Sequence, residues 1–222
     1  MCGITGITKT TKFNQLHISG ATMLCHRGPD HQGNWENDYL KLEHSRLAIV
    51  DLSDAGNQPF EQTKGQVLVF NGEIYNFQEL RKNWFDSSIP WKTQSDTEVL
   101  YRGLLKKGLN CLNELNGMFA FGFYNSDSNK IFLARDRYGI KPLYYYHDGL
   151  NFIFASEQKV IAEFTGWNPD LDNLSEYFVF KYVSGNKTMI KNIYELEPGH
   201  AAEFDINTGK LKIWRWHDFV KE

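Results

Sequence analysis

Hydrophobic and polar residues alternate along much of this chain in short runs. Alternation of this kind, with many β-branched and aromatic side chains, predicts β-strands. The segments that fit are residues 3–7, 40–50, 66–70, 120–124, 130–135, 143–146 and 151–155. Near the C-terminus, the stretch AAEFDINTGKLKIWRW has an NTG turn between two such runs and predicts a closing hairpin.

A second periodicity predicts helices between and around these strands. The clearest helix covers residues 96–107, where Ser95 or Asp96 caps the start, Lys106 and Lys107 occupy the last turn, and Gly108 ends it. Weaker helical patterns cover residues 76–83, 156–164 and 172–181.

The order of these elements indicates the fold class. Strands come in runs and helices do not alternate strictly with them, which favours an α+β layered fold with mainly antiparallel sheets over a doubly wound parallel sheet. We find no internal repeat and no low-complexity linker, so we expect one domain over residues 1–222. Because the final residues carry no stop signal, we expect this domain to be the N-terminal part of a longer protein.

Composition and charge narrow the function classes. A net charge of −3, without a long basic run, argues against nucleic acid as a partner. We find no signal-peptide pattern and no apolar stretch of about 18 residues, so we expect a soluble, cytoplasmic protein without a membrane partner. The three cysteines and seven histidines show neither disulfide-framework nor metal-ligand spacing, so we expect reduced thiols and no metal.

The cysteine at position 2 is the first candidate for chemistry. Removal of Met1 would place the thiol of Cys2 and a free α-amino group on one residue, and Gly3 would let the backbone pass close to a substrate. An α-amino group has an ordinary pKa of about 7.7 to 8.0, so it could accept the thiol proton and later deliver it to a leaving group. Taken alone, such a residue is more often an incidental small hydrophobe.

Six motifs give Cys2 its context. MCGITGI opens the chain, followed by HRGPD at 26–30, RLAIVD at 46–51, NGEIYN at 71–76, SDTEV at 95–99 and ARDRYGIKPLYY at 134–145. In this order they resemble the glutaminase domain of glutamine-dependent asparagine synthetases, a branch of the class II amidotransferases. The resemblance implies an N-terminal-nucleophile hydrolase fold with four αββα layers and two stacked antiparallel sheets.

The resemblance also implies a pocket for both charges of free glutamine. Arg46 is expected to bind the α-carboxylate, since its planar fork suits a carboxylate, although a strand-end arginine is ordinarily a solvated charge. Asp96, with Glu73 nearby, is expected to bind the α-ammonium, although the position of Asp96 also fits a helix cap or first-turn acid. The strand after Arg46 is expected to line the pocket through Leu47, Ala48, Ile49 and Val50, chiefly by backbone contacts, with the side chains of Ile49 and Val50 in the core.

The reacting end of glutamine would meet Cys2 and an oxyanion hole. By the resemblance, the side-chain amide of Asn71 and the backbone N–H of Gly72 form that hole, although an isolated Asn-Gly pair more often marks a hairpin turn. The resemblance assigns the HRGPD stretch to positioning a loop near the site, so we expect no direct chemical role for His26.

These residues predict hydrolysis of L-glutamine to L-glutamate and ammonia through a γ-glutamyl thioester on Cys2. Ammonia would pass to a C-terminal synthetase domain or a separate accepting subunit, and the sequence is also compatible with a homodimer. In the family, the acceptor domain binds ATP and Mg in a loop rich in Ser and Gly, which this chain lacks, so no cofactor is expected here. Two alternatives are a catalytically silent docking module of the same fold and an N-terminal-nucleophile hydrolase for another amide.

Overall fold

The computed structural model describes residues 1–10 and 19–218 and contains two six-stranded antiparallel sheets. In space, the strands of the first sheet follow the order β10 (Ile193–Glu195), β8 (Tyr144–His147), β9 (Phe152–Ala155), β1 (Gly3–Thr8), β3 (Leu40–Arg46) and β2 (His31–Glu36). The second sheet follows the order β12 (Lys210–Arg215), β11 (His200–Asp205), β7 (Lys130–Arg135), β6 (Gly117–Asn125), β5 (Gln66–Ile74) and β4 (Phe60–Glu61). β11 and β12 form the predicted C-terminal hairpin.

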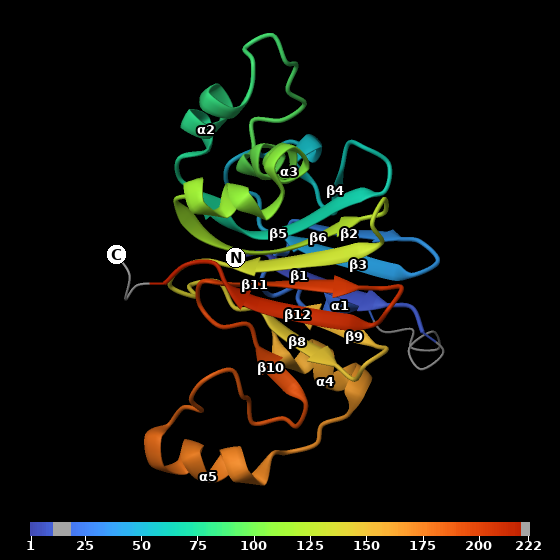
Figure 1. Ribbon diagram of the computed structural model, residues 1–222, viewed down its shortest axis with the longest axis vertical. Coiled ribbons are helices and arrows are strands. Elements are labelled where there is room, and N and C mark those ends of the chain that lie inside the picture. Colours follow the sequence, from blue (N-terminus) through green and yellow to red (C-terminus); the bar gives the residue numbers. More distant parts are fainter. Residues whose placement is uncertain (11–18, 219–222) are drawn as a thin grey trace.

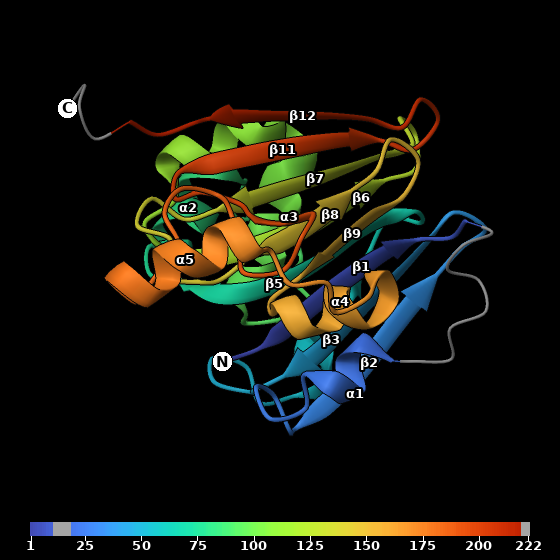
Figure 2. The ribbon, with the colours of Figure 1, turned by 90° about the horizontal axis from the view of Figure 1, so that it is seen from below.

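Helices cover the outer faces of both sheets. Figure 1 shows α2 (Phe77–Trp84) and α3 (Asp96–Lys107) above the second sheet, and Figure 2 shows α1 (Gly20–Met23) and α4 (Gln158–Thr165) across the first. Two 3₁₀ helices, η1 (Asp54–Gly56) and η2 (Gly108–Glu114), complete these connections. The predicted four-layer α+β arrangement is confirmed.

Three apolar clusters fill the spaces between the four layers. The inter-sheet cluster includes Ile4 of β1, Leu42 of β3 and Val69 of β5. A second cluster joins β5 and β6 to α2 and α3, and a third joins the first sheet to α1 and α4. Each central strand therefore buries both faces, which explains why the apolar runs are nearly continuous.

The helix α5 (Leu171–Phe180) stands apart from these layers (Figure 1). Asp170 caps its start by accepting hydrogen bonds from the backbone N–H groups of Asp172 and Asn173. Several of its large apolar side chains are exposed, Phe178 and Val179 among them. It corresponds to the helix predicted at residues 172–181.

Most predicted elements are present with ends shifted by a few residues, and α3 and β7 match at both ends. The prediction for residues 40–50 was wrong at its end, because β3 stops at Arg46. Arg46 pairs with His31, the first residue of β2, and Ser45 pairs with Gly3, the first residue of β1. Beyond Arg46 neither neighbouring strand continues, so the chain has no partner for its backbone and leaves the sheet.

The elements missing from the sequence prediction are short or polar. They are α1, β2, β4, β10 and the two 3₁₀ helices. β2 reads HQGNWE and lies at the edge of its sheet, where no residue is fully buried and hydrophobic alternation is weak.

Candidate active site

At one end of the sandwich, the layer between the two sheets changes from apolar to polar. On β1, Ile4 faces the other sheet, and Cys2 lies two positions before it on the same face. On β3, Leu42 is followed on that face by His44 and then by Arg46. The two-residue period of the strands thus brings Cys2 and Arg46 to one end of the inter-sheet space.

The inner face of the second sheet also changes from apolar to polar at this end. Along β5, Val69 faces the first sheet, so Asn71 and Glu73 point the same way by alternation. The intervening Phe70 packs on the opposite face, against the helices. Two strands from different sheets therefore supply polar groups to a shared space.

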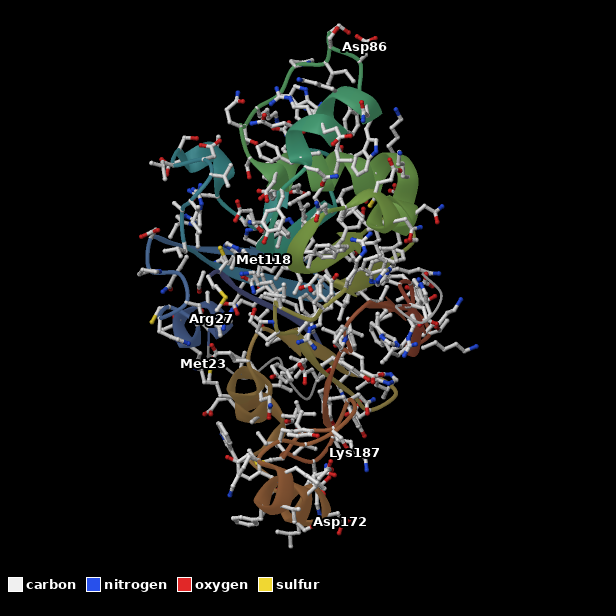
Figure 3. All side chains as sticks on the ribbon, turned by 90° about the vertical axis from the view of Figure 1, so that its left-hand side faces the viewer. Met23, Arg27, Asp86, Met118, Asp172 and Lys187 are labelled. Carbon is white, nitrogen blue, oxygen red and sulfur yellow. The ribbon has the colours of Figure 1, made fainter. Side chains whose placement is uncertain are left out.

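These groups line a cavity of about 160 Å³. Figure 3 shows Met118, which also lines it, and Arg27 on one side face of the molecule, between the loop at Asp86 and the helix at Asp172. The predicted residues in its wall are Cys2, Arg46, Leu47, Ile49, Val50, Asn71, Gly72, Glu73 and Asp96.

The thiol of Cys2 contacts the backbone of Leu47. The Leu47 N–H donates to the sulfur at 3.4 Å, and the thiol lies 3.7 Å from the Leu47 carbonyl oxygen. Burial raises the pKa of the thiol, and the Leu47 hydrogen bond, the terminal amine and Arg46 act against that rise. The thiol is therefore held by the same segment that leaves β3 after Arg46.

Arg27 fixes the backbone of Cys2. Its Nε donates to the Cys2 carbonyl oxygen at 2.9 Å, and its Nη1 lies 3.1 Å from Glu157 Oε1. His26 meets the same carboxylate oxygen at 2.8 Å and is not part of the cavity wall. The HRGPD stretch thus ties the first strand to the start of α4.

The outer edge of β5 presents backbone N–H groups toward the cavity side. The Phe70 N–H donates to Gln58 Oε1 at 2.6 Å, and the Ile74 N–H donates to Asp96 Oδ2 at 2.9 Å. Gly72 lies midway between these residues, so alternation directs its N–H out from the same edge. A Cβ at Gly72 would lie 2.3 Å from the Met118 carbonyl oxygen, so only glycine allows β5 and β6 to approach this closely.

Asn71 is buried with both polar atoms of its side chain unpaired. Its exposed fraction is 1%, and neither Oδ1 nor Nδ2 has a hydrogen-bond partner among the described residues. Leaving a buried polar group unpaired costs about 1–3 kcal/mol, so folded proteins rarely do so without a functional reason. The amide of Asn71 is therefore available to a ligand in the cavity.

The guanidinium of Arg46 is held by the loop that follows it. Nη1 donates to the Ser53 carbonyl oxygen at 2.8 Å and to Asn57 Oδ1 at 2.6 Å, and Nη2 donates to the Asp51 carbonyl oxygen. A Cβ at Gly56 would lie 2.5 Å from Nη2, so glycine leaves room for the fork. These bonds use three of the five N–H groups of an arginine, and two remain for a ligand.

Asp96 is the first residue of α3, and Ser95 caps the helix by accepting a hydrogen bond from the Thr97 N–H at 3.1 Å. Burial raises the pKa of Asp96 to about 6, against hydrogen bonds from Ile74, Ser95 and Thr97 that favour the carboxylate. A carboxyl group at this position is nearly buried and titrates close to neutrality, as functional carboxyls often do.

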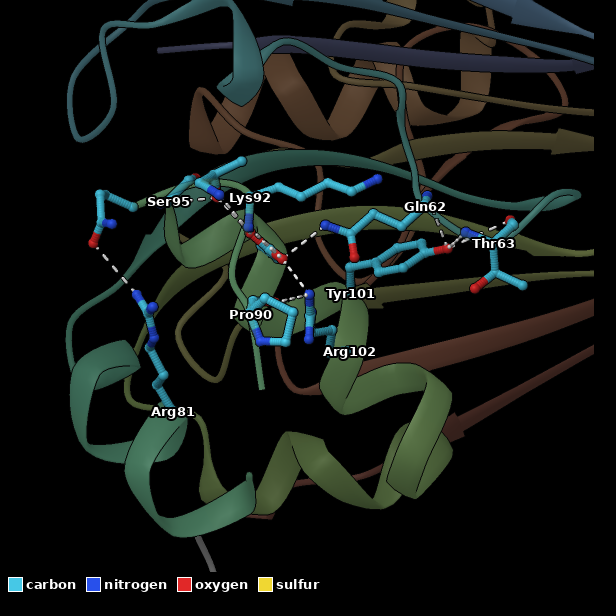
Figure 4. A network of polar contacts seen from close by, with 11 residues as sticks. Gln62, Thr63, Arg81, Pro90, Lys92, Ser95, Tyr101 and Arg102 are labelled. Atoms are coloured by element: carbon cyan, nitrogen blue, oxygen red, sulfur yellow. Dashed lines mark hydrogen bonds and ion pairs between the residues drawn. The ribbon is translucent and has the colours of Figure 1, made fainter. Parts of the chain in front are cut away.

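A buried network holds the start of α3 in place (Figure 4). Glu98, fully buried, pairs with Arg102 at 2.7 Å and accepts from Gln62 Nε2 at 2.7 Å. It also accepts from the Thr93 N–H at 2.7 Å and from the Lys92 N–H at 3.1 Å. Burial raises the pKa of Glu98, but these donors outweigh it and the net pKa is lowered. The carboxylate fixes the loop that leads into Asp96.

A comparison of sequences places this chain in a known group of proteins. The profile of the glutamine amidotransferase domain matches residues 1–216. This chain belongs to that family.

Curated relatives of this amidotransferase domain carry matching names. Glutamine-hydrolyzing asparagine synthetase B of Escherichia coli is 39% identical over 96% of this chain, and glutamine-hydrolyzing asparagine synthetase 3 of Bacillus subtilis is 37% identical over 100% of it. The chain spans 37% of the length of each of these relatives. Among solved structures, glutamine phosphoribosylpyrophosphate amidotransferase of B. subtilis superposes with a TM-score of 0.68 at 19% identity, covering 97% of this chain and 49% of that one. This likeness shows a shared fold.

The structure differs from two of the sequence predictions for the pocket. Ile49 and Val50 were expected in the core, and this was wrong: their exposed fractions are 65% and 39%. They lie in the segment that leaves β3, at the rim of the cavity instead of inside the sheet. Ala48 is not in the cavity wall, and its backbone N–H donates to Asp30 Oδ2 at 2.8 Å.

Sequence reasoning missed Lys141. This lysine is 5% exposed and lines the cavity of the amidotransferase domain with Cys2 and Met118. The motif ARDRYGIKPLYY contains it, but nothing in the spacing shows that its side chain reaches a cavity made by other strands. Other buried residues around the site, such as Gln58 and Glu98, are also visible only in three dimensions.

The described residues contain no group of three or more His, Cys, Asp or Glu side chains that could hold a metal ion. Over the same part of the chain, no helix is long and apolar enough to cross a membrane. Cys2, Cys25 and Cys111 are all free thiols.

Proposed function

We propose that this chain hydrolyses L-glutamine to L-glutamate and ammonia with Cys2 as nucleophile, once Met1 has been removed. The sulfur attacks the side-chain carbonyl carbon of glutamine and forms a C–S bond. The terminal amine takes the thiol proton and delivers it to the nitrogen that leaves as ammonia. Water then cleaves the γ-glutamyl thioester and restores the thiol.

The observation that carries this proposal is the unpaired amide of Asn71 in the cavity wall beside Cys2. Attack on the amide of glutamine places negative charge on the carbonyl oxygen, and preorganised N–H donors lower the energy of that state. The Nδ2 of Asn71 and the outward N–H of Gly72 would supply two such donors. A docking module without chemistry would have no need for an unpaired buried amide.

The same cavity suits the amino-acid end of glutamine. The two remaining N–H groups of Arg46 would receive the α-carboxylate. The carboxylates of Asp96 and Glu73 would receive the α-ammonium, and the rim at Leu47, Ile49 and Val50 would supply backbone contacts. A pocket for both charges favours a free amino acid over other amides as substrate.

We further propose that the ammonia passes to an acceptor domain of the asparagine-synthetase type, which uses ATP and Mg to activate a carboxylate. The support is the naming of the relatives as glutamine-hydrolyzing asparagine synthetases and their greater length. Aspartate is the acceptor that those names indicate.

The test is turnover of glutamine by protein whose N-terminus has been checked by mass spectrometry. We expect ammonia and glutamate in equal amounts from the form that begins at Cys2, and no turnover above background from Cys2→Ala. Cys25→Ala, which removes an exposed thiol outside the cavity wall, serves as the matched control and should retain activity. Equal ammonia release by Cys2→Ala would refute the mechanism, and an inactive wild-type protein with a free Cys2 would favour the silent-module alternative.

A further inference from the structure

Lys141 differs from the other lysines that the structure describes. Five of them form ion pairs, for example Lys130 with Glu203 at 2.6 Å and Lys107 with Glu114 at 2.6 Å, and their side chains are 29–38% exposed. Lys141 is 5% exposed and has no ion pair within residues 1–10 and 19–218. Burying a cation without a paired anion is costly, so its retention calls for a reason.

The loop before Lys141 is built around one carboxylate. Asp136, fully buried, accepts hydrogen bonds from the backbone N–H groups of Phe119 at 3.1 Å and of Tyr138, Ile140 and Lys141 at 3.0 Å each. Four donors on one buried carboxylate fix both the loop and its attachment to β6. The backbone N–H of Lys141 is therefore held by the carboxylate that orders the rest of the loop.

Arg135 fixes the carbonyl side of the same residue. Its Nε donates to the Lys141 carbonyl oxygen at 2.8 Å, and its Nη2 donates to the Gly139 carbonyl oxygen at 2.7 Å. Gly139 has a φ of 66°, which lets the chain turn back toward the sheet. With both peptide groups clamped, the backbone of Lys141 is held where its side chain forms part of the cavity wall.

The charges around this side chain come from several elements. Burial lowers the pKa of Lys141, Arg27 lowers it further, and Cys2, Asp136 and Glu73 act in the opposite direction. Burial also lowers the pKa of the terminal amine, on which Arg27 and Lys141 act in the same direction, while Cys2 and Asp30 oppose them. Two further charges act on the Cys2 thiol, since Arg46 lowers its pKa and Asp96 raises it. Arg27 is already paired with Glu157, whereas Lys141 forms no ion pair in the described part of the chain and shares the cavity wall with Cys2.

The charge of Lys141 influences how many protons the Cys2 thiol and the terminal amine hold together. The proposed reaction needs the pair to hold one proton, because an amine that is already protonated cannot accept the proton of the thiol. A fixed cation nearby disfavours the second proton. After removal of Met1, the amine lies one residue closer to the thiol, and the same reasoning applies to it.

We propose that Lys141 is a positioning residue that acts on the protonation of the Cys2 thiol and the terminal amine. At neutral pH its charge favours the state in which these two groups hold one proton between them over the state in which they hold two. The biological meaning of this role rests on the proposed function. The role itself concerns the protonation of Cys2, which can be measured without glutamine. Lys141 exerts it through charge, so arginine can replace it and an uncharged residue of the same length cannot.

The experiment is the pH dependence of Cys2 alkylation by iodoacetamide, followed on the N-terminal peptide by mass spectrometry so that Cys25 does not interfere. We compare wild type, Lys141→Met and Lys141→Arg, all beginning at Cys2, with Lys130→Met as a control that removes one cation outside the cavity wall. We expect the midpoint of alkylation to rise by about one pH unit in Lys141→Met. It should stay within a few tenths of a unit of wild type in Lys141→Arg and Lys130→Met.

Other outcomes overturn the proposal. An unchanged midpoint in folded Lys141→Met would show that the charge does not act on Cys2, even if the KM for glutamine changes. Should Lys141→Met not fold, Lys141→Gln takes its place. Failure of glutamine turnover in wild type would refute the proposed function. The alkylation midpoints would still show whether the charge of Lys141 acts on Cys2.

Discussion

At the scale of single residues, the unpaired amide of Asn71 is the feature that separates this site from an ordinary sheet end. Asn173 offers a contrast, because it is also buried but its Nδ2 donates to the Thr188 carbonyl oxygen at 2.9 Å. One buried asparagine is satisfied by the fold, and the other is available to a ligand. Substitution of each should therefore have opposite consequences.

We expect Asn71→Ala to lower kcat for glutamine hydrolysis by about 10²- to 10³-fold, with little change in the free energy of unfolding. Asn173→Ala should leave kcat within about twofold and lower the free energy of unfolding by about 1 kcal/mol, the usual contribution of one hydrogen bond. Steady-state kinetics and urea titrations measure the two quantities. Similar kinetic losses in both variants would contradict the assignment of Asn71.

The carboxyl of Asp96 predicts how glutamine binding depends on pH. Its pKa of about 6 means that it is largely protonated below that pH, whereas binding of an α-ammonium needs the carboxylate. The KM for glutamine should therefore rise up to about tenfold per pH unit below about pH 6. Asp96→Asn should bind glutamine weakly at every pH, with this dependence removed. A wild-type KM that is constant between pH 5 and 8 would count against the proposed role.

At the scale of elements, the position of Asp96 depends on the network around Glu98, which joins α3 to the loop before it and to the segment that follows β4. Its donors come from Gln62, from the loop at Thr93 and from Arg102 one turn later in the helix. The carboxylate thus replaces the backbone partners that an irregular loop lacks.

Glu98→Ala should lower the free energy of unfolding by about 3 kcal/mol, because it leaves the charge of Arg102 and several buried N–H groups without a partner. It should also weaken glutamine binding, since the start of α3 carries Asp96. Glu79→Ala on α2, where the side chain is exposed, should change stability by less than about 0.5 kcal/mol. Thermal unfolding and glutamine titration test both effects, and intact binding in Glu98→Ala would show that the network is not needed to place Asp96.

At the scale of the whole molecule, His44 joins the two sheets. It is fully buried on β3, and its Nε2 lies 3.1 Å from the Phe70 carbonyl oxygen on β5, the residue before Asn71. Burial lowers the pKa of His44 to about 3, and Arg46 and His31 lower it too, against the Phe70 hydrogen bond. The folded protein therefore holds this histidine uncharged.

Because His44 is held uncharged, the folded protein loses stability in acid. In the unfolded chain a histidine binds a proton below about pH 6.5, whereas in the folded protein His44 does not until about pH 3. Between these values the unfolded state holds more protons, so stability falls as pH falls, by up to about 1.4 kcal/mol per pH unit. His44→Gln should show a flatter dependence of unfolding free energy on pH between 6 and 4. Parallel curves for the two proteins would contradict this account.

The sequence by itself determined the class of fold, most strands and helices, and the identity of the family, because hydrophobic periodicity and local motifs are written in consecutive residues. Strand alternation also determines which side chains of one strand share a face, but the meeting of Cys2, Arg46 and Asn71 in one layer depends on how the two sheets stack. The end of β3 could not be read locally, because Ile49 and Val50 are apolar and β-branched, and only the ends of β1 and β2 stop the pairing.

Only the tertiary structure decided which polar groups are satisfied. Lys141 lies many residues from Cys2 in the sequence, and it reaches the cavity because Asp136 and Arg135 clamp its loop. Whether Asn71 lacks a partner, and whether His44 is uncharged, likewise depend on what other strands bring beside them. Desolvation and hydrogen bonding are properties of the three-dimensional surroundings, and a linear pattern of residue types does not contain them.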